Sequence, residues 1–151
     1  MLLTAGHNLI NNKGVKAKYL TVLSGNTRVG EECFKICQEY EQHPTEDYSA
    51  YDYGAVLLPK DKSKSRDGFG LNLGFSSDDD KLEGVVHVSG YRDTSDKPVT
   101  SFGDIVASGR QLKYKAPTEQ GMSGSPVWAA YDGFAVAVAI QYVQLELYSR
   151  T

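Results

Sequence analysis

One segment, QGMSGSPVW at 120–128, places a serine between two glycines and follows it with an apolar run that a proline opens. Glycine has no Cβ atom, so the chain there can adopt backbone angles that other residues resist. A serine hydroxyl attacks a carbonyl group well only when a base takes its proton and donors hold the oxyanion that forms. Ser123 is therefore a candidate nucleophile, and the amides of Gly121 and Ser123 are candidate oxyanion donors. A plain glycine-serine turn, common in β proteins, is the alternative.

A base and an orienting acid for that serine can be found elsewhere in the chain. The histidines are His7, His43 and His87, and imidazole is the commonest general base in proteins. His7 lies in the segment TAGHNL, and Asp52 lies in YDYGAVLL at the head of an apolar run. The order histidine, aspartate, serine is that of chymotrypsin and differs from that of subtilisins and α/β-hydrolases. A surface histidine at position 7 and a surface aspartate at a strand start are the alternatives.

These motifs resemble those of the chymotrypsin-fold (trypsin-like) serine endopeptidases, and most closely those of the glutamyl-endopeptidase (V8-like) branch. The signatures of that branch stand here in order: TAxH at 4–7, DYGA[IV] at 52–56 and GxSGSPV at 121–127. Further likenesses are the VSGY and DKP pieces within 88–98, and a tyrosine and a threonine upstream of the serine at Tyr114 and Thr118. The resemblance extends over nearly the whole chain.

The resemblance implies an all-β fold, a chymotrypsin-like double β-barrel whose active site lies between the barrels. One trypsin-like serine peptidase domain would span residues 1–151, with part of the first barrel at 1–65 and the second barrel at 66–151. Only six residues precede His7, whereas the family fold places two strands of the first barrel before that histidine. We therefore expect an incomplete domain whose first barrel lacks its N-terminal strands.

The resemblance also implies a serine endopeptidase that cleaves peptide bonds through a Ser-His-Asp triad and an acyl-enzyme, without a metal or cofactor. Ser123 would be the nucleophile, His7 the base and Asp52 the partner that orients the base. Thr118 and Gln141 would line the substrate pocket. Gln141 stands where the branch has a histidine that reads acidic side chains, and an amide adds no charge to such a contact. Members of the branch are secreted, which implies an extracellular location.

The composition fits one β-rich domain and argues against other classes of function. The chain has 151 residues, enough for one sizeable core, and is rich in tyrosine (10) and glycine (15). Its net charge of −3 argues against a nucleic-acid-binding surface. No apolar run reaches the length of a membrane span, and the N-terminus does not resemble a signal peptide. We expect a monomer whose partners are peptide or protein substrates.

Short strands and one helical turn must position the proposed triad. The first half predicts the end of a strand at 1–4, a helical turn at 5–10, and strands at 19–24, 31–40 and 54–58. The second half predicts strands at 84–89, 99–108 and 111–115, and a hairpin of 127–131 and 134–142 around an Asp-Gly turn. The charged stretch 59–70 predicts a loop, and the acidic run 78–80 predicts an exposed turn rather than a calcium site.

Two alternatives to a serine endopeptidase stay open at this point. Cys33 and Cys37 would lie roughly 13 Å apart along a strand, beyond the reach of a disulfide, so we expect two free thiols. A C-x3-C pair without partner ligands does not predict a metal site. The first alternative is a catalytically inactive or truncated protease-like binding module. The second, more distant, is a thiol hydrolase that uses Cys33 or Cys37.

Overall fold

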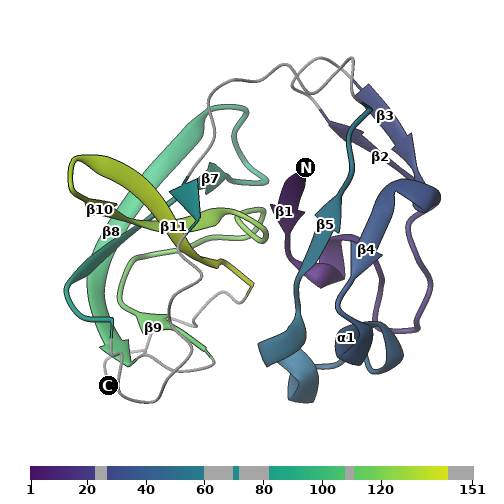
Figure 1. The fold of residues 1–151 in the computed structure, drawn as a ribbon, viewed down its shortest axis with the longest axis horizontal. Helices are drawn as coiled ribbons and strands as arrows, with labels where there is room; N and C mark the ends of the chain where they lie inside the picture. Colours follow the sequence, from purple (N-terminus) through teal and green to yellow (C-terminus); the bar gives the residue numbers. More distant parts are fainter. Residues whose placement is uncertain (23–26, 60–69, 72–81, 108–110, 143–151) are drawn as a thin grey trace. The chain divides into compact units, whose positions relative to one another are not determined.

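The computed structural model describes residues 1–22, 27–59, 70–71, 82–107 and 111–142. Strands make up most of the regular structure, and the helices are few and short (Figure 1). This content confirms the predicted all-β class. The chain divides into two compact units, Met1–Phe69 and Gly70–Thr151.

The first unit holds a three-stranded antiparallel sheet and a separate two-stranded hairpin (Figure 1). The sheet has the order β1-β5-β4, with bounds β1 (Leu2–Thr4), β5 (Gly54–Val56) and β4 (Phe34–Ile36). The hairpin pairs β2 (Tyr19–Val22) with β3 (Thr27–Gly30). The helices are η1 (Gly6–Asn8), η2 (Glu31–Cys33), α1 (Gln38–Gln42) and η3 (Glu46–Tyr51).

The second unit holds one six-stranded sheet of order β6-β11-β10-β7-β8-β9. Its strands are β6 (Gly70–Leu71), β7 (Val85–Tyr91), β8 (Pro98–Ala107), β9 (Lys113–Tyr114), β10 (Pro126–Tyr131) and β11 (Phe134–Ile140). Neighbours pair antiparallel, except that β6 runs parallel to β11. The predicted hairpin is confirmed as β10 and β11. Its turn residues Asp132 and Gly133 have φ of 48° and 81°, the positive values that a tight two-residue turn requires.

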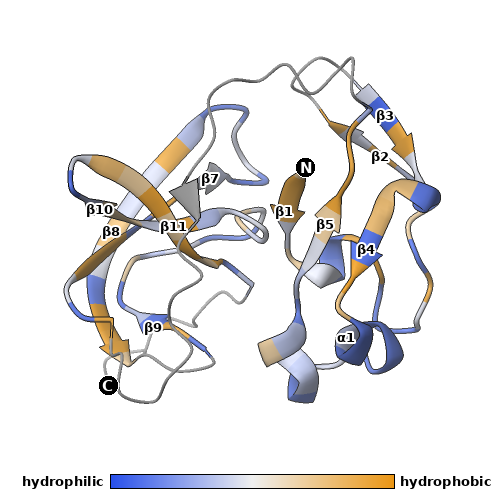
Figure 2. Cartoon of the chain, viewed as in Figure 1, coloured by the Kyte–Doolittle hydropathy of each residue, from blue (hydrophilic) through white to orange (hydrophobic). Residues whose placement is uncertain are grey.

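Each unit has its own apolar core, built mainly from strand residues that alternate between a buried and an exposed face, together with residues of the adjoining turns. In the first unit the buried cluster is Leu9, Val29, Phe34 and Val56. In the second unit it is Val86, Val88, Tyr114, Ala116, Met122 and Val127. Figure 2 shows apolar residues along β1 and β5 and along the β10–β11 hairpin. The core of the first unit includes Leu9, two positions after His7, and the core of the second unit includes Met122, directly before Ser123. Each core therefore anchors a segment that carries a proposed catalytic residue.

The predicted single strand at 31–40 is wrong, because this stretch forms η2, then β4, then α1. Helix α1 has the sequence QEYEQ, mostly of good helix formers, and carries two glutamates in its first turn. There the glutamates face the positive end of the helix dipole, which favours the helix over a strand. Cys33 and Cys37 flank the short β4, and both thiols are free, as predicted.

Of the other predicted elements, one strand is confirmed only in part, and two stretches lie mostly or wholly outside the described residues. The strand predicted at 111–115 is confined to the two residues of β9. Most of the predicted loop at 59–70 and the whole acidic run 78–80 lie outside the described residues. Within the part of the chain that the structure describes, none of the three sheets closes into a barrel. The double barrel, its division into residues 1–65 and 66–151, and its missing N-terminal strands therefore stay predictions.

Candidate functional site

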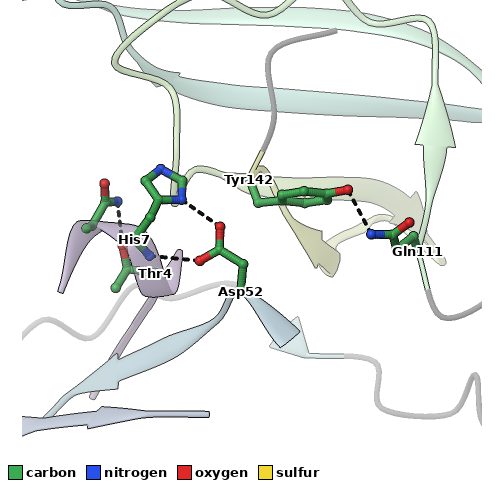
Figure 3. A network of polar contacts seen from close by, with 6 residues as sticks. Thr4, His7, Asp52, Gln111 and Tyr142 are labelled. Atoms are coloured by element: carbon green, nitrogen blue, oxygen red, sulfur yellow. Dashed lines mark hydrogen bonds and ion pairs between the residues drawn. The ribbon is translucent and has the colours of Figure 1, made fainter. Parts of the chain in front are cut away.

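Helix η1, which carries His7, is fixed to the core on one side and to β1 on the other. The N–H of Leu9 donates to Gly6 O at 2.8 Å, which closes the helical turn. The Leu9 side chain is fully buried, whereas His7 lies on the exposed side of the turn. Asn8 Nδ2 donates to Thr4 Oγ1 at 3.0 Å and ties the helix back to the strand (Figure 3). The turn therefore presents the imidazole while its neighbour anchors the backbone.

Asp52 is placed by the end of η3 and the start of β5. Its N–H donates to Ser49 O at 3.2 Å, which closes the last turn of η3. Strand β5 is the central strand of the three-stranded sheet, paired with β1 on one side and β4 on the other. A residue just ahead of a strand that is paired on both sides has little freedom to move. The sequence prediction that Asp52 stands at the head of a buried strand is confirmed.

The structure brings Asp52 and His7 into direct contact through two hydrogen bonds (Figure 3). His7 Nδ1 lies 2.6 Å from Asp52 Oδ2, and the backbone N–H of His7 donates to Asp52 Oδ1 at 2.8 Å. The aspartate side chain is 5% exposed and the histidine side chain 35%. An ionised carboxylate can only accept, so the proton in the short bond belongs to Nδ1. Nε2 is then the ring nitrogen with a lone pair, which is what a general base needs.

A glycine and a tyrosine complete the surroundings of the Asp52 carboxylate. A Cβ atom added at Gly6 would lie 2.8 Å from Tyr40 Cδ1 and 2.9 Å from Asp52 Oδ1, closer than such atoms can approach. The Tyr40 ring and the carboxylate therefore pack directly on the bare backbone of Gly6. Burial raises the pKa of Tyr40, and the nearby negative charge of Asp52 raises it further. Gly6 and Tyr40 position the pair, although the sequence motifs singled out neither role.

In the second unit, the segment around Ser123 takes its shape from backbone hydrogen bonds. The N–H of Met122 donates to Glu119 O at 3.1 Å, and the N–H of Ser125 donates to Met122 O at 3.0 Å. Gly121 and Gly124 have φ of 95° and 88°, in the left-handed region that glycine adopts without strain. Two consecutive turns thus carry the chain past Ser123, and the buried Met122 side chain holds them to the core.

The segment 90–93 packs against this serine-bearing turn. The N–H of Asp93 donates to Gln120 O at 3.0 Å. A Cβ atom added at Gly121 would collide with the Asp93 amide nitrogen, and one added at Gly90 would collide with Ser125 Oγ. Both glycines are therefore required for close packing. This explains in physical terms why glycine stands at 121, a position that the sequence singled out for another reason.

The backbone N–H groups near Ser123 differ in whether they already donate. Those of Met122, Gly124 and Ser125 are each used in a backbone hydrogen bond. Among the described residues, no backbone oxygen accepts from the N–H of Gly121. Gly121 is one of the two residues predicted to hold an oxyanion, and its geometry is compatible with that role.

The predicted pocket residues Thr118 and Gln141 are brought together. Gln141 Nε2 donates to Thr118 Oγ1 at 3.3 Å, and the hydroxyl of Tyr114 donates to Gln141 Oε1. Burial raises the pKa of Tyr114, and the neighbouring Tyr142 raises it further. The hydroxyl of Tyr142 accepts a 2.8 Å bond from Gln111 Nε2 (Figure 3). The sequence motifs identified Tyr114 as a position that resembles the glutamyl-endopeptidase branch, but only the structure reveals its contact with Gln141.

The remaining histidines are held in stacks with other rings. His43 stacks on Tyr48 with ring centroids 4.6 Å apart, and His87 stacks on Trp128 at 4.3 Å. Such ring packing is typical of a structural role, whereas His7 alone of the three contacts a buried carboxylate in the described residues.

The thiol of Cys37 is engaged locally. Cys37 Sγ donates to Glu39 Oε2 at 3.0 Å. The pKa of Tyr53 is raised to about 12, mainly by a hydrogen bond with Cys37 and to a lesser degree by burial. In the described ranges neither Cys33 nor Cys37 bonds to a histidine, the base that a thiol nucleophile would need.

Within the ranges that the structure describes, no group of three or more His, Cys, Asp or Glu side chains is arranged to hold a metal ion. None of the described helices is long and apolar enough to cross a membrane.

Comparisons with protein families, with curated proteins and with solved structures gave no match to this chain.

Proposed function

We propose that this protein is a serine endopeptidase of the chymotrypsin-like double-barrel fold, similar to the glutamyl-endopeptidase branch. Ser123 is the nucleophile, His7 the general base, and Asp52 the partner that fixes the His7 ring. The amides of Gly121 and Ser123 hold the oxyanion, and Thr118 and Gln141 line the pocket for the substrate side chain. The location that follows from the resemblance is extracellular.

The His7–Asp52 pair is the observation that carries the proposal. A buried carboxylate that accepts from both Nδ1 and the backbone N–H of one histidine fixes the ring's tautomer and its orientation. That arrangement leaves Nε2 to accept a proton and lets the carboxylate stabilise the imidazolium that results. A surface histidine with a purely structural role has no need of an almost fully buried anionic partner, whose desolvation is costly.

In the proposed reaction, Ser123 Oγ bonds to the scissile carbonyl carbon while His7 Nε2 takes the hydroxyl proton. The carbonyl oxygen becomes an oxyanion, and each backbone donor to it typically contributes about 3 kcal/mol. His7 then gives its proton to the leaving amine as the carbon–nitrogen bond breaks. Water, deprotonated by His7, attacks the acyl-enzyme and releases the acid and the free serine. The proposal requires that His7 Nε2 come within hydrogen-bonding distance of Ser123 Oγ.

A fluorophosphonate probe, which phosphonylates activated serines, tests the proposal. We expect the folded chain to be labelled at Ser123 and to hydrolyse peptide substrates, and both properties to disappear in Ser123→Ala. Ser125→Ala is the matched control, since it removes a neighbouring hydroxyl and should retain labelling within about threefold. Absence of labelling in folded wild-type protein would refute the proposal and favour a protease-like protein without activity. Peptide hydrolysis that persists in Ser123→Ala and is abolished by iodoacetamide would instead support the thiol alternative.

A further inference from the structure

Two contacts join the start of the serine-bearing turn to a segment that is distant in the sequence. The N–H of Asp93 donates to Gln120 O at 3.0 Å. One residue earlier on each side, Arg92 Nε lies 3.1 Å from Glu119 Oε1 in an ion pair. These two contacts, called the clasp, involve consecutive residues of both segments. They therefore restrain the peptide group that joins Gln120 to Gly121.

The clasp determines the direction of the backbone N–H of Gly121. The peptide bond between Gln120 and Gly121 is trans, and in a planar trans peptide the C=O and N–H bonds point in opposite directions. Because Asp93 binds the carbonyl oxygen of Gln120, the N–H of Gly121 points away from Asp93. Rotation of this peptide group by half a turn would break that bond and put a carbonyl oxygen where the N–H now lies.

Such a restraint matters because glycine opposes this rotation less than other residues do. Gly121 has a φ of 95°, and without a Cβ atom it can adopt negative φ values as readily. Rotation of the peptide group changes φ of Gly121 together with ψ of Gln120. The residue that permits close packing on Asp93 therefore also permits the rotation, and the contact with Asp93 is what opposes it.

The two halves of the clasp differ in origin and in strength. Asp93 is the second residue of a turn that the N–H of Ser95 closes by donating to Arg92 O at 3.2 Å, so the backbone presents its N–H. The ion pair joins side chains that are 38% and 52% exposed, so solvent screens it and its contribution is small. Asp93 Oδ1 also lies against Gly121, so a test must separate the N–H of Asp93 from its carboxylate.

We propose that Arg92, Asp93 and Glu119 are positioning residues for the oxyanion donor, because the clasp keeps the N–H of Gly121 directed at the substrate oxygen. This inference rests on the proposed peptidase function and adds the residues that hold its donor in place. They act through the Gln120–Gly121 peptide group and do not touch the reacting atoms. Loss of the clasp should therefore lower kcat, which depends on the oxyanion, more than it changes KM.

Asp93→Pro removes the N–H, and Asp93→Ala, which keeps the N–H and removes the carboxylate, is its matched control. Proline is favoured at the second position of such a turn, so the variant fits the local backbone. We expect kcat for a peptide substrate to be at least about tenfold lower in Asp93→Pro than in Asp93→Ala, because complete loss of one oxyanion donor costs about 100- to 1,000-fold. KM should agree within about threefold.

A peptide aldehyde gives a second measure of the oxyanion donor. It adds the Ser123 hydroxyl across its carbonyl group, and the oxygen of the resulting hemiacetal occupies the oxyanion site. Its inhibition constant should rise in Asp93→Pro by about the same factor as kcat falls, while KM stays nearly constant. A merely structural role would move KM and the inhibition constant together.

An exchange of charges tests the ion pair without altering the turn. Arg92→Glu and Glu119→Arg should each lower kcat about fivefold, the upper range for a partly exposed pair. The double variant, which restores opposite charges in reversed order, should return kcat to within about twofold of wild type. Lys97→Glu, at an exposed cation of the same unit, is the control for the change in net charge and should leave kcat unchanged.

Labelling of Ser123 by the fluorophosphonate distinguishes the ways in which the inference can fail. Labelled protein in which Asp93→Pro and Asp93→Ala have equal kcat would overturn the inference and leave the peptidase function standing. A double variant no more active than Arg92→Glu would overturn the role of the ion pair, and it decides the matter alone if Asp93→Pro does not fold. Folded wild-type protein that is not labelled would overturn the peptidase function and this inference with it.

Discussion

The two units hold their parts of the proposed triad by different means. In the first unit, one carboxylate, that of Asp52, binds both the ring and the backbone of His7. In the second unit, the segment around Ser123 is shaped by backbone hydrogen bonds and by glycines at positive φ. The first arrangement depends on a charge and the second on the absence of Cβ atoms.

This difference indicates which substitutions each unit should tolerate. A geometry held by one side chain fails when the chemistry of that side chain changes, even if its shape is kept. A geometry held by the backbone survives changes of polar side chains but fails when an added atom collides with a neighbouring strand or turn. Paired substitutions, one at the site and one at a matched control position, can therefore separate the two arrangements.

The largest effect is expected from Asp52→Asn, which keeps the shape of the side chain and removes its charge. An amide can donate to Nδ1, which favours the wrong tautomer of His7 and removes the stabilisation of the imidazolium. We expect kcat to fall about 10,000-fold while the fold is retained. Measurements of kcat and of circular dichroism check this. Asp47→Asn, at an exposed acid in η3, the helix that ends just before Asp52, is the control. An Asp52→Asn enzyme within tenfold of wild type would contradict the account.

In the second unit, Gly121→Ala should reduce activity about 100-fold or more. The added Cβ atom both meets the left-handed backbone angle and collides with the Asp93 amide nitrogen, so the oxyanion donors must move. Gly133→Ala is a closely matched control, because Gly133 also has a positive φ but nothing lies within 4 Å of the added atom. The control should cost about 1 kcal/mol of stability and leave kcat/KM unchanged. Equal loss of activity in both variants would show that strain alone, not packing at the turn, is responsible.

The two cores allow a comparison of stability. Leu9 lies under the histidine-bearing turn and Met122 under the serine-bearing turn, and both are fully buried. We expect Leu9→Ala and Met122→Ala each to lower the free energy of unfolding by about 2–5 kcal/mol, as cavities in close-packed cores do. Urea denaturation measures this loss. Leu57→Ala, at a residue 44% exposed, should cost less than about 1 kcal/mol. A smaller loss for the core variants than for Leu57→Ala would be inconsistent with the packing.

The smallest effect concerns alkaline stability. The pKa of Tyr114 is higher in the folded chain than its ordinary value near 10, so the unfolded state releases the proton first as the pH rises. The stability that Tyr114 contributes is complete below about pH 10 and falls above it, with a slope of about 1.4 kcal/mol per pH unit. Tyr114→Phe should therefore show a shallower loss of stability between pH 10 and 11.5 than wild type, as measured by urea denaturation. Tyr131→Phe, at a residue 67% exposed, should keep the wild-type slope. An unchanged slope in Tyr114→Phe would contradict the conclusion that the Tyr114 hydroxyl is buried in its protonated form in the folded chain.

Local patterns in the sequence predicted much of the fold. Period-two alternation predicted strand β7, and the Asp-Gly pair predicted the β10–β11 turn, because both signals depend on neighbours in the chain. The stretch 31–40 was predicted wrongly because closely mixed apolar and polar residues fit a half-exposed strand as well as a short helix. The parallel pairing of β6 with β11 joins distant residues and leaves no local signal.

The candidate site shows the same limit. The motif flanks identified His7, Asp52 and Ser123, and the first two are in contact as predicted. The parts that the sequence did not reveal are close packing and orientation: the tyrosine that covers Gly6, and the hydroxyl that fixes the amide of Gln141. Both depend on residues far apart in the chain that meet only in the folded unit.

The most direct test of the account is the rate at which a fluorophosphonate labels Ser123 in wild type and in His7→Gln. It asks whether the base held in one unit activates the nucleophile held in the other. We expect wild type to be labelled readily and the second-order rate constant to fall at least about 1,000-fold in His7→Gln, with the fold intact by circular dichroism. Labelling of His7→Gln at the wild-type rate would contradict the account.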